Sequence, residues 1–255
     1  MKIDVFGAIF LDRYIYEEED STQVVESIGG SGLSIALGLH LLGHDVRFYG
    51  NIGQDERKDK ILNELENNCF PIEGISIKSG VTGLFTAKND KLESVERGVN
   101  AEELTIDMEL LSGECAVITT ELNKISLQRI LSLSWEKIFL DIGPRPHMLD
   151  DIILPENIIK IGNSKENEKS SCHIVKLGPY GAKWGNTVVG GSNESLPYTI
   201  GAGDLFDTIL IDSTLRDKDK RKALELAVKY AEESCKMQGG FKFEKLKDKM
   251  DLKSS

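Results

Sequence analysis

The sequence lacks several features that mark common classes of protein. No apolar run approaches the ~20 residues that a membrane-spanning helix needs. The first twelve residues, MKIDVFGAIFLD, are interrupted by Asp4, and no small-residue cleavage site follows them, so we expect no signal peptide. Basic residues are in deficit, because 31 Lys+Arg stand against 42 Asp+Glu and give a formal net charge of −11. This balance argues against nucleic acid or an anionic membrane surface as a partner.

Cysteine is scarce and scattered. The four cysteines form no CxxC pair and have no histidine nearby at metal-ligand spacing. We therefore expect neither a disulfide framework nor a structural zinc site, but reduced thiols in a cytoplasmic protein. What the 255 residues do contain is 40% hydrophobic and 29% charged side chains. This composition can build a packed core in one large α/β domain or two small ones.

Apolar runs and amphipathic segments alternate along most of the chain. We expect strands at 3–9 and 45–50, helices at 33–42 and 54–68, a second alternating series from residue 115, and final helices at about 202–215 and 219–237. Such alternation predicts an α/β fold, in which helices cover a central, mostly parallel sheet.

Two segments interrupt this alternation and read as β-hairpins. Both contain short alternating runs, and the second also contains the turn pair Asn89-Asp90. We expect them to form a small β-sheet lid, made of residues 13–28 and 72–99. The α/β domain is then built from residues 1–12, 29–71 and 100–255.

The strongest local motif is TIGAGD at residues 199–204, which precedes an apolar helical segment. Two glycines around one alanine allow a tight turn, and the first amides of the following helix can bind an anion. Asp204 would accept a proton from a hydroxyl at the same place. The alternative interpretation is that the turn only changes the chain direction and that Asp204 caps the helix.

A second glycine-rich turn covers residues 29–32 (GGSG) and precedes the predicted helix at 33–42. It does not fit the dinucleotide-binding fingerprint, and the chain contains no GxxxxGK[ST] phosphate loop. A turn of this kind permits close approach of a small polar molecule, but alone it indicates no particular ligand.

Taken together and in their order along the chain, these motifs resemble a known family. The Gly-Gly turn near residue 30, the GNIGQD string at residues 50–55 and the late GAGD are similar to those of the ribokinase-like carbohydrate kinases, the PfkB family. The resemblance extends over nearly the whole chain. It implies a three-layer, Rossmann-like ribokinase fold with a β-lid, and ATP-dependent phosphorylation of a sugar or nucleoside hydroxyl. It further implies ATP and Mg²⁺ as cofactors and allows a homodimer formed through the lid.

The resemblance also implies site residues. It assigns the general base to Asp204 and the anion hole to Gly201, Ala202 and Gly203. The implied substrate-binding residues are Asp12, Gly30, Ser34 and Glu121. The implied nucleotide-side residues are Asn163, Glu166, Gly178 and Gly181, with Glu166 linked indirectly to Mg²⁺. On the residues alone, Asp12 could instead be a solvated turn acid, and Glu121 could cap a helix.

Four features depart from the family pattern. Ser34 stands where ribose-type members usually carry Asn, and Lys176 replaces a small hydroxyl residue. Tyr198 replaces an Asp that helps to bind a monovalent cation in some members, so activation by potassium is in doubt. The segment between Glu166 and the strand at 173–177 is also short, so we expect a short member of the family. The shortened segment and Tyr198 leave open an alternative, a catalytically impaired ligand-binding or regulatory protein on the same fold.

Overall fold

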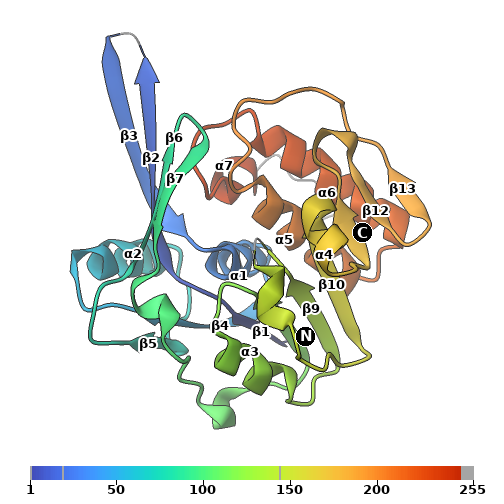
Figure 1. Ribbon diagram of the computed structural model, residues 1–255, viewed down its shortest axis with the longest axis horizontal. Coiled ribbons are helices and arrows are strands. Elements are labelled where there is room, and N and C mark those ends of the chain that lie inside the picture. The colour runs from blue at the N-terminus through green and yellow to red at the C-terminus, as the bar shows by residue number, and fades with distance from the viewer. Residues whose placement is uncertain (1, 19, 144, 248–255) are drawn as a thin grey trace.

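The computed structural model describes residues 2–18, 20–143 and 145–247 and is built around a nine-stranded sheet (Figure 1). In spatial order the strands are β13 (Thr187–Val189), β12 (Ala182–Trp184), β11 (Ile174–Lys176), β10 (Ile158–Asn163), β9 (Lys137–Asp141), β8 (Cys115–Thr119), β1 (Lys2–Phe6), β4 (Asp45–Ile52) and β5 (Ile75–Ile77). Neighbouring strands from β11 to β5 pair in parallel, whereas β12 and β13 pair antiparallel. All carboxyl ends of the parallel strands therefore lie along one edge of the sheet.

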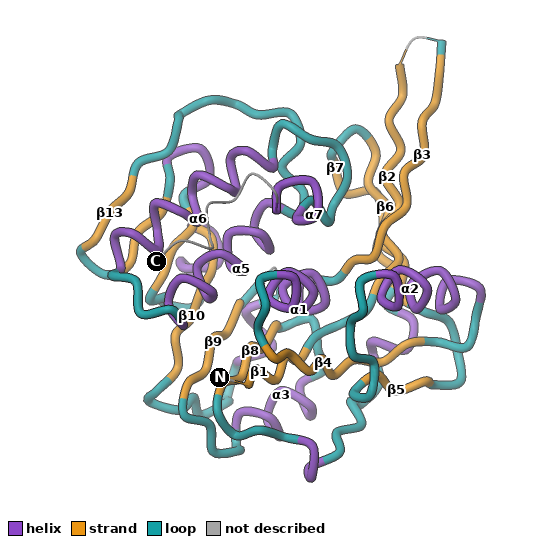
Figure 2. Tube along the Cα trace, turned by 180° about the vertical axis from the view of Figure 1, so that it is seen from behind, coloured by secondary structure: helices purple, strands orange, loops and turns teal. Residues whose placement is uncertain are grey.

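Helices cover both faces of this sheet. They are α1 (Ser31–Leu41), α2 (Glu56–Asn67), α3 (Lys124–Leu131), α4 (Ser164–Lys169), α5 (Ala202–Leu215), α6 (Lys220–Ser234) and α7 (Phe243–Lys247), with short 3-10 turns η1 (Gly98–Ala101), η2 (Met108–Leu110), η3 (Pro146–Leu149) and η4 (Gly178–Tyr180). Figure 2 shows α1, α5, α6 and α7 on one side of the sheet and α3 on the other. No helix in the described ranges has the length and apolar character to cross a membrane.

The alternation of side chains along each strand explains this layering. In β1, Ile3 and Val5 join the core under α1 and α5, whereas Phe6 joins the core that contains α3. In β8, Val117 and Ile118 divide between the two cores in the same way. Strands with apolar residues on both faces need cover on both sides, which a parallel sheet with crossover helices provides. The predicted α/β fold with a mostly parallel sheet is confirmed.

The predicted helices form, with local reasons for their ends. The α1 helix is not amphipathic, because every residue from Gly32 to Leu39 is buried between the sheet and α5. The α2 helix is amphipathic, with Ile61 and Leu65 buried. Its first turn is capped by Asp55, whose side chain accepts a hydrogen bond from the Lys58 amide at 3.3 Å.

The small sheet contains β3 (Ser21–Gly29), β2 (Phe10–Glu18), β6 (Gly83–Lys88) and β7 (Lys91–Glu96), in that spatial order. It projects from the main body in Figure 1. Two expected boundaries differ. The first hairpin, expected at 13–28, begins with β2 at Phe10 and ends with β3 at Gly29. In addition β5, at residues 75–77, pairs with β4 in the main sheet, because the three residues continue its parallel register. The second hairpin thus begins at β6. The division into an α/β domain and a lid stays a prediction, and the last eight residues of that domain lie outside the described chain.

Candidate functional site

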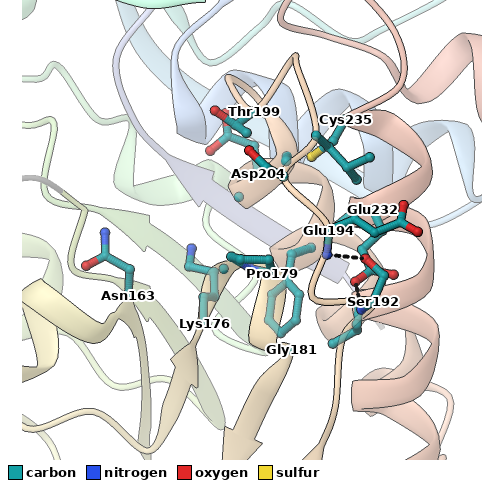
Figure 3. A pocket seen from close by; sticks show the side chains of 18 of the residues that line it. Asn163, Lys176, Pro179, Gly181, Ser192, Glu194, Thr199, Asp204, Glu232 and Cys235 are labelled. Carbon is teal, nitrogen blue, oxygen red and sulfur yellow. Dashed lines mark hydrogen bonds between the residues drawn. The ribbon is translucent and has the colours of Figure 1, made fainter.

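A cavity of about 460 Å³ opens at the carboxyl edge of the main sheet. Three of its lining residues end neighbouring strands: Asp141 ends β9, Asn163 ends β10 and Lys176 ends β11. The first turn of α5, with Gly203 and Asp204, forms another part of the wall. Figure 3 shows Asn163, Lys176 and Asp204 around this cavity. Polar side chains from distant segments therefore meet at one place, as expected where parallel strands end.

The turn into α5 has the conformation that the GAGD motif predicts. Gly201 has φ +80°, and a Cβ at this position would lie 2.1 Å from the Gly240 carbonyl oxygen, so only glycine fits. The amide of Ala202 donates to the Thr199 carbonyl at 3.2 Å. In the described chain, no backbone carbonyl accepts from the amides of Gly203 and Asp204. The amides of residues 203 and 204 are thus free to meet a ligand, whereas that of Ala202, one of the three residues expected to form the anion hole, is already used within the turn.

Asp204 lies in an environment that makes it a stronger base than an ordinary aspartate. Its pKa is raised to about 6, first by burial and then by the nearby Asp141 carboxylate, while the Lys176 ammonium and a hydrogen bond from Ser31 oppose the shift. A carboxylate with this pKa is ionised at neutral pH yet accepts a proton more readily than a solvated one.

Lys176 is the only cation that lines the cavity within the described chain. Its ammonium lies 2.9 Å from Asp207 Oδ2 and 3.7 Å from Asp141 Oδ1. Burial alone would lower the pKa of Lys176, but these two carboxylates outweigh it and raise the pKa. The ammonium is also 3.6 Å from the position that a Cβ on Gly203 would take. A permanent positive charge therefore lies beside the open amides of α5.

The acidic residues expected on the substrate side lie close to Asp204. The pKa of Glu121 is raised to about 7, first by burial and then by the Asp204 carboxylate, while the amides of Ser31 and Gly32 oppose the shift. Burial likewise raises the pKa of Asp12 well above its usual range, with smaller contributions from Asp204 and Glu121. Three carboxylates that affect one another's ionisation are near neighbours. They could accept hydrogen bonds from several hydroxyl groups of one ligand.

The glycine turn before α1 allows this close arrangement. Gly30 has φ +96°, and a Cβ there would lie 2.2 Å from the Ala8 carbonyl oxygen. A Cβ on Gly29 would lie 1.9 Å from Asp12 Oδ1. Asp12 Oδ2 in turn accepts a hydrogen bond from the Tyr14 hydroxyl at 2.8 Å. The turn thus brings α1 against the base of the small sheet, where Asp12 lies.

The residues expected on the nucleotide side all line the large cavity. Asn163 and Glu166 form a capping box at the start of α4, in which Glu166 Oε2 accepts from the Asn163 amide at 2.7 Å. Burial raises the pKa of Glu166, and the Asp141 carboxylate contributes to this shift. Gly178 (φ +61°) begins η4 and Gly181 (φ +95°) directly follows it, and both line the same cavity.

Ser34 and Tyr198 do not line the large cavity. Ser34 is 8% exposed and borders a separate crevice of about 10 Å³, together with Asp204 and Lys242. Tyr198 packs edge-to-face on Tyr16 of the small sheet, with ring centroids 5.8 Å apart. Ser34, expected to bind substrate, thus shares the small crevice with Gly201 and Asp204 of the α5 turn.

Sequence reasoning missed several residues of this site, among them Asp141, Ser31 and Asp90. Asp141 and Ser31 act on the ionisation of Asp204. Asp90, in the turn between β6 and β7, accepts from the Thr199 amide at 2.6 Å. Asp141 could have been identified from the sequence, because it ends an apolar strand and the carboxyl ends of parallel strands commonly form a ligand site. The contact of Asp90 could not be identified in this way, because 109 residues separate it from its partner.

Comparisons with known proteins find a family model and similar solved structures. Residues 1–120 match the family model described as pfkB family carbohydrate kinase. The chain is similar to the ribokinase of Thermotoga maritima (18% identity, TM-score 0.74, covering 94% of this chain and 95% of that chain). It is also similar to the ribokinase of Cryptococcus neoformans in complex with ADP (17% identity, TM-score 0.77, covering 98% of this chain and 99% of that chain). A third similar structure is the nucleoside kinase of Methanocaldococcus jannaschii (17% identity, TM-score 0.75, covering 97% of this chain and 97% of that chain). The comparison with curated proteins gives no match.

The resemblance to the PfkB, ribokinase-like carbohydrate kinases is thereby confirmed. The family model covers the first 120 residues, which include the small sheet and the turn before α1. Over the whole chain, the similar structures establish the ribokinase-like fold, with its central sheet and smaller second sheet.

Proposed function

We propose that this protein is an ATP-dependent kinase that phosphorylates a hydroxyl group of a sugar or a nucleoside. The observation that carries the proposal is the position of Asp204. Its carboxylate adjoins the open amides at the start of α5, on the wall of a cavity large enough for a small ligand. A general base and an anion-binding turn at one point are what phosphoryl transfer to a hydroxyl requires.

In this proposal Asp204 takes the proton of the acceptor hydroxyl while the hydroxyl oxygen attacks the γ-phosphorus of ATP. The bond from that phosphorus to the bridging oxygen breaks, and ADP leaves. The amides of Gly203 and Asp204 stabilise the negative charge on the transferred phosphoryl group. The Lys176 ammonium adds positive charge beside them. Asp12 and Glu121 orient the acceptor by accepting hydrogen bonds from its other hydroxyls.

The nucleotide would occupy the large cavity. Val228 and Ala231 of α6 and Leu196 of the loop before α5 line this cavity with apolar side chains that are available to a nucleobase. Gly178 and Gly181, which line the cavity on either side of Pro179, present no side chains to it. Mg²⁺ would neutralise charge on the phosphates. Glu166 and Asp141 would hold this ion, because both carboxylates line the cavity and carboxylate oxygens are the ligands that Mg²⁺ takes in proteins.

We further propose that the small sheet is a lid. Its inner face, with Tyr14, Tyr16 and Ala87, packs on Tyr198 and Ile200, which directly precede the α5 turn. Closure of such a sheet over a bound acceptor would exclude water and so limit hydrolysis of ATP. A homodimer through the lid stays a prediction.

The test is to measure ADP release from ATP and Mg²⁺ over a panel of sugars and nucleosides. We expect one class of acceptor to support turnover, and Asp204→Asn to lower kcat by about 10²- to 10⁴-fold with acceptor binding nearly unchanged. Asp59→Asn, at a side chain that is 70% exposed on α2, is the matched control and should leave kcat unchanged. Near-normal turnover by Asp204→Asn would refute the assignment of the base.

The same panel separates the alternative, a catalytically impaired ligand-binding or regulatory protein. If a compound raises the midpoint of thermal unfolding but no compound of the panel supports ADP release, the result would favour the ligand-binding or regulatory protein over the kinase.

A further inference from the structure

The loop that enters the α5 turn is held by a buried lysine. Lys242 is 2% exposed, and its ammonium donates to the carbonyl oxygens of Tyr198 and Ile200, each at 2.9 Å. Burial lowers the pKa of Lys242 to about 8, which means that the protein holds this charge at a cost. Its acceptors are neutral carbonyls, so the charge is not there to complete an ion pair with them.

The two carbonyls belong to the segment on which the anion-binding amides depend. The Ile200 carbonyl is in the peptide bond to Gly201, and Gly201 is the left-handed residue that starts α5. The chain around Lys242 supports the same turn, since the Gly240 carbonyl is where a Cβ on Gly201 would fall. A shift of the Tyr198 or Ile200 carbonyl would therefore reorient the peptides that lead to Gly203 and Asp204.

The opposite side of this loop is held by an opposite charge. Asp90 Oδ2 accepts from the Thr199 amide at 2.6 Å, from the Thr199 hydroxyl at 3.0 Å and from the Ile200 amide at 3.4 Å. The N–H groups of the loop thus face a carboxylate, while its C=O groups face an ammonium. Both charges act on the same peptide dipoles in the same sense, and together they fix the loop's orientation.

We propose that Lys242 is a positioning residue whose ammonium is a built-in cation for the loop 198–200, in place of a dissociable monovalent cation. This proposal rests on the proposed kinase function. It accounts for Tyr198, whose phenol ring supplies no carboxylate to bind a free cation. Because a potassium or ammonium ion also binds carbonyl oxygens, the space left by a truncated Lys242 side chain should accept either ion.

The first experiment measures turnover in KCl and in choline chloride at equal ionic strength. We expect wild-type kcat to be the same in both salts. We expect the kcat of Lys242→Ala in choline chloride to fall about 100-fold, because a small displacement of the reacting groups has an effect of this order. The KM for the acceptor should change little. KCl or NH₄Cl should restore much of that loss in a saturable way. Lys245→Ala, at an exposed side chain three residues away, is the control and should respond to neither salt.

A second readout does not depend on turnover. The thermal unfolding midpoint of Lys242→Ala should rise with KCl relative to choline chloride, whereas wild type and Lys245→Ala should show no such difference. Equal midpoints for Lys242→Ala in the two salts would overturn the proposal, as would a wild-type protein that needs K⁺. The wild-type comparison remains decisive if Lys242→Ala does not fold. Absent turnover with a K⁺-dependent midpoint would refute the kinase function while supporting the role of Lys242.

Discussion

Removal of the Lys176 ammonium should destabilise the protein strongly. Asp207 is fully buried, and its Oδ2 lies 2.9 Å from Lys176 Nζ, while Oδ1 has no partner in the described chain. Lys176→Met keeps the volume and the methylene contacts but leaves that carboxylate buried without its counter-ion. Loss of one partner of a buried pair typically costs about 3–5 kcal/mol of unfolding free energy. For a chain of this size, that corresponds to a fall of about 10 °C in the midpoint.

Urea unfolding followed by tryptophan fluorescence measures this loss, and a double-mutant cycle identifies its origin. Lys176→Met combined with Asp207→Leu should recover most of the stability, because the lone charge is then gone. The sign of the pH dependence follows from the same reasoning. Without the ammonium, Asp207 takes up a proton more easily in the folded state than in the unfolded one. The loss of unfolding free energy in Lys176→Met relative to wild type therefore becomes smaller as pH falls and larger as pH rises. A loss below about 1 kcal/mol, or a double variant as unstable as the sum of the singles, would refute this account.

Three further predictions concern the α5 turn and the lid. The kcat/KM profile should have an acidic limb near pH 6 from Asp204, and Asp141→Asn should move it to lower pH because a like charge is removed; an unmoved limb would contradict this. Gly201→Ala should lower kcat and cost about 1–3 kcal/mol of stability, measured by urea unfolding, because φ +80° strains alanine. Asp90→Ala should speed hydrogen exchange of the Ile200 amide, read by mass spectrometry, and unchanged exchange would show that Asp90 does not hold the loop.

Much of the fold could be predicted because its local patterns are unambiguous. The α2 helix has a capping aspartate, an amphipathic pattern and no competing turn residues, and it forms where expected. The strand β5 could not be assigned, since the three residues ISI fit either sheet and only the register with β4 decides. The local pattern of apolar and polar residues predicts whether a segment is a helix or a strand. Which strand it pairs with depends on contacts between segments that are distant in the sequence.

The candidate site divides in the same way. Asp204 and Gly201 could be found because one short motif holds both and each residue type has a physical reason to be there. Lys242 could not, because it follows Gly201 by 41 residues in a charged segment that otherwise reads as solvated surface. Only the folded chain shows that its ammonium is buried against the loop.

The net charge of −11 is of little consequence for binding a polyanion such as ATP. Exposed charges act over a Debye length of about 8 Å at physiological salt, so most of the surface carboxylates are screened from the cavity. The charges that remain are near ones. Asp141 and Glu166 repel phosphate, and Lys176, the open α5 amides and a Mg²⁺ ion would offset them. Nucleotide affinity would then depend on a few fixed dipoles and one buried ammonium, and these are groups that composition cannot reveal because their effect comes from where the fold places them.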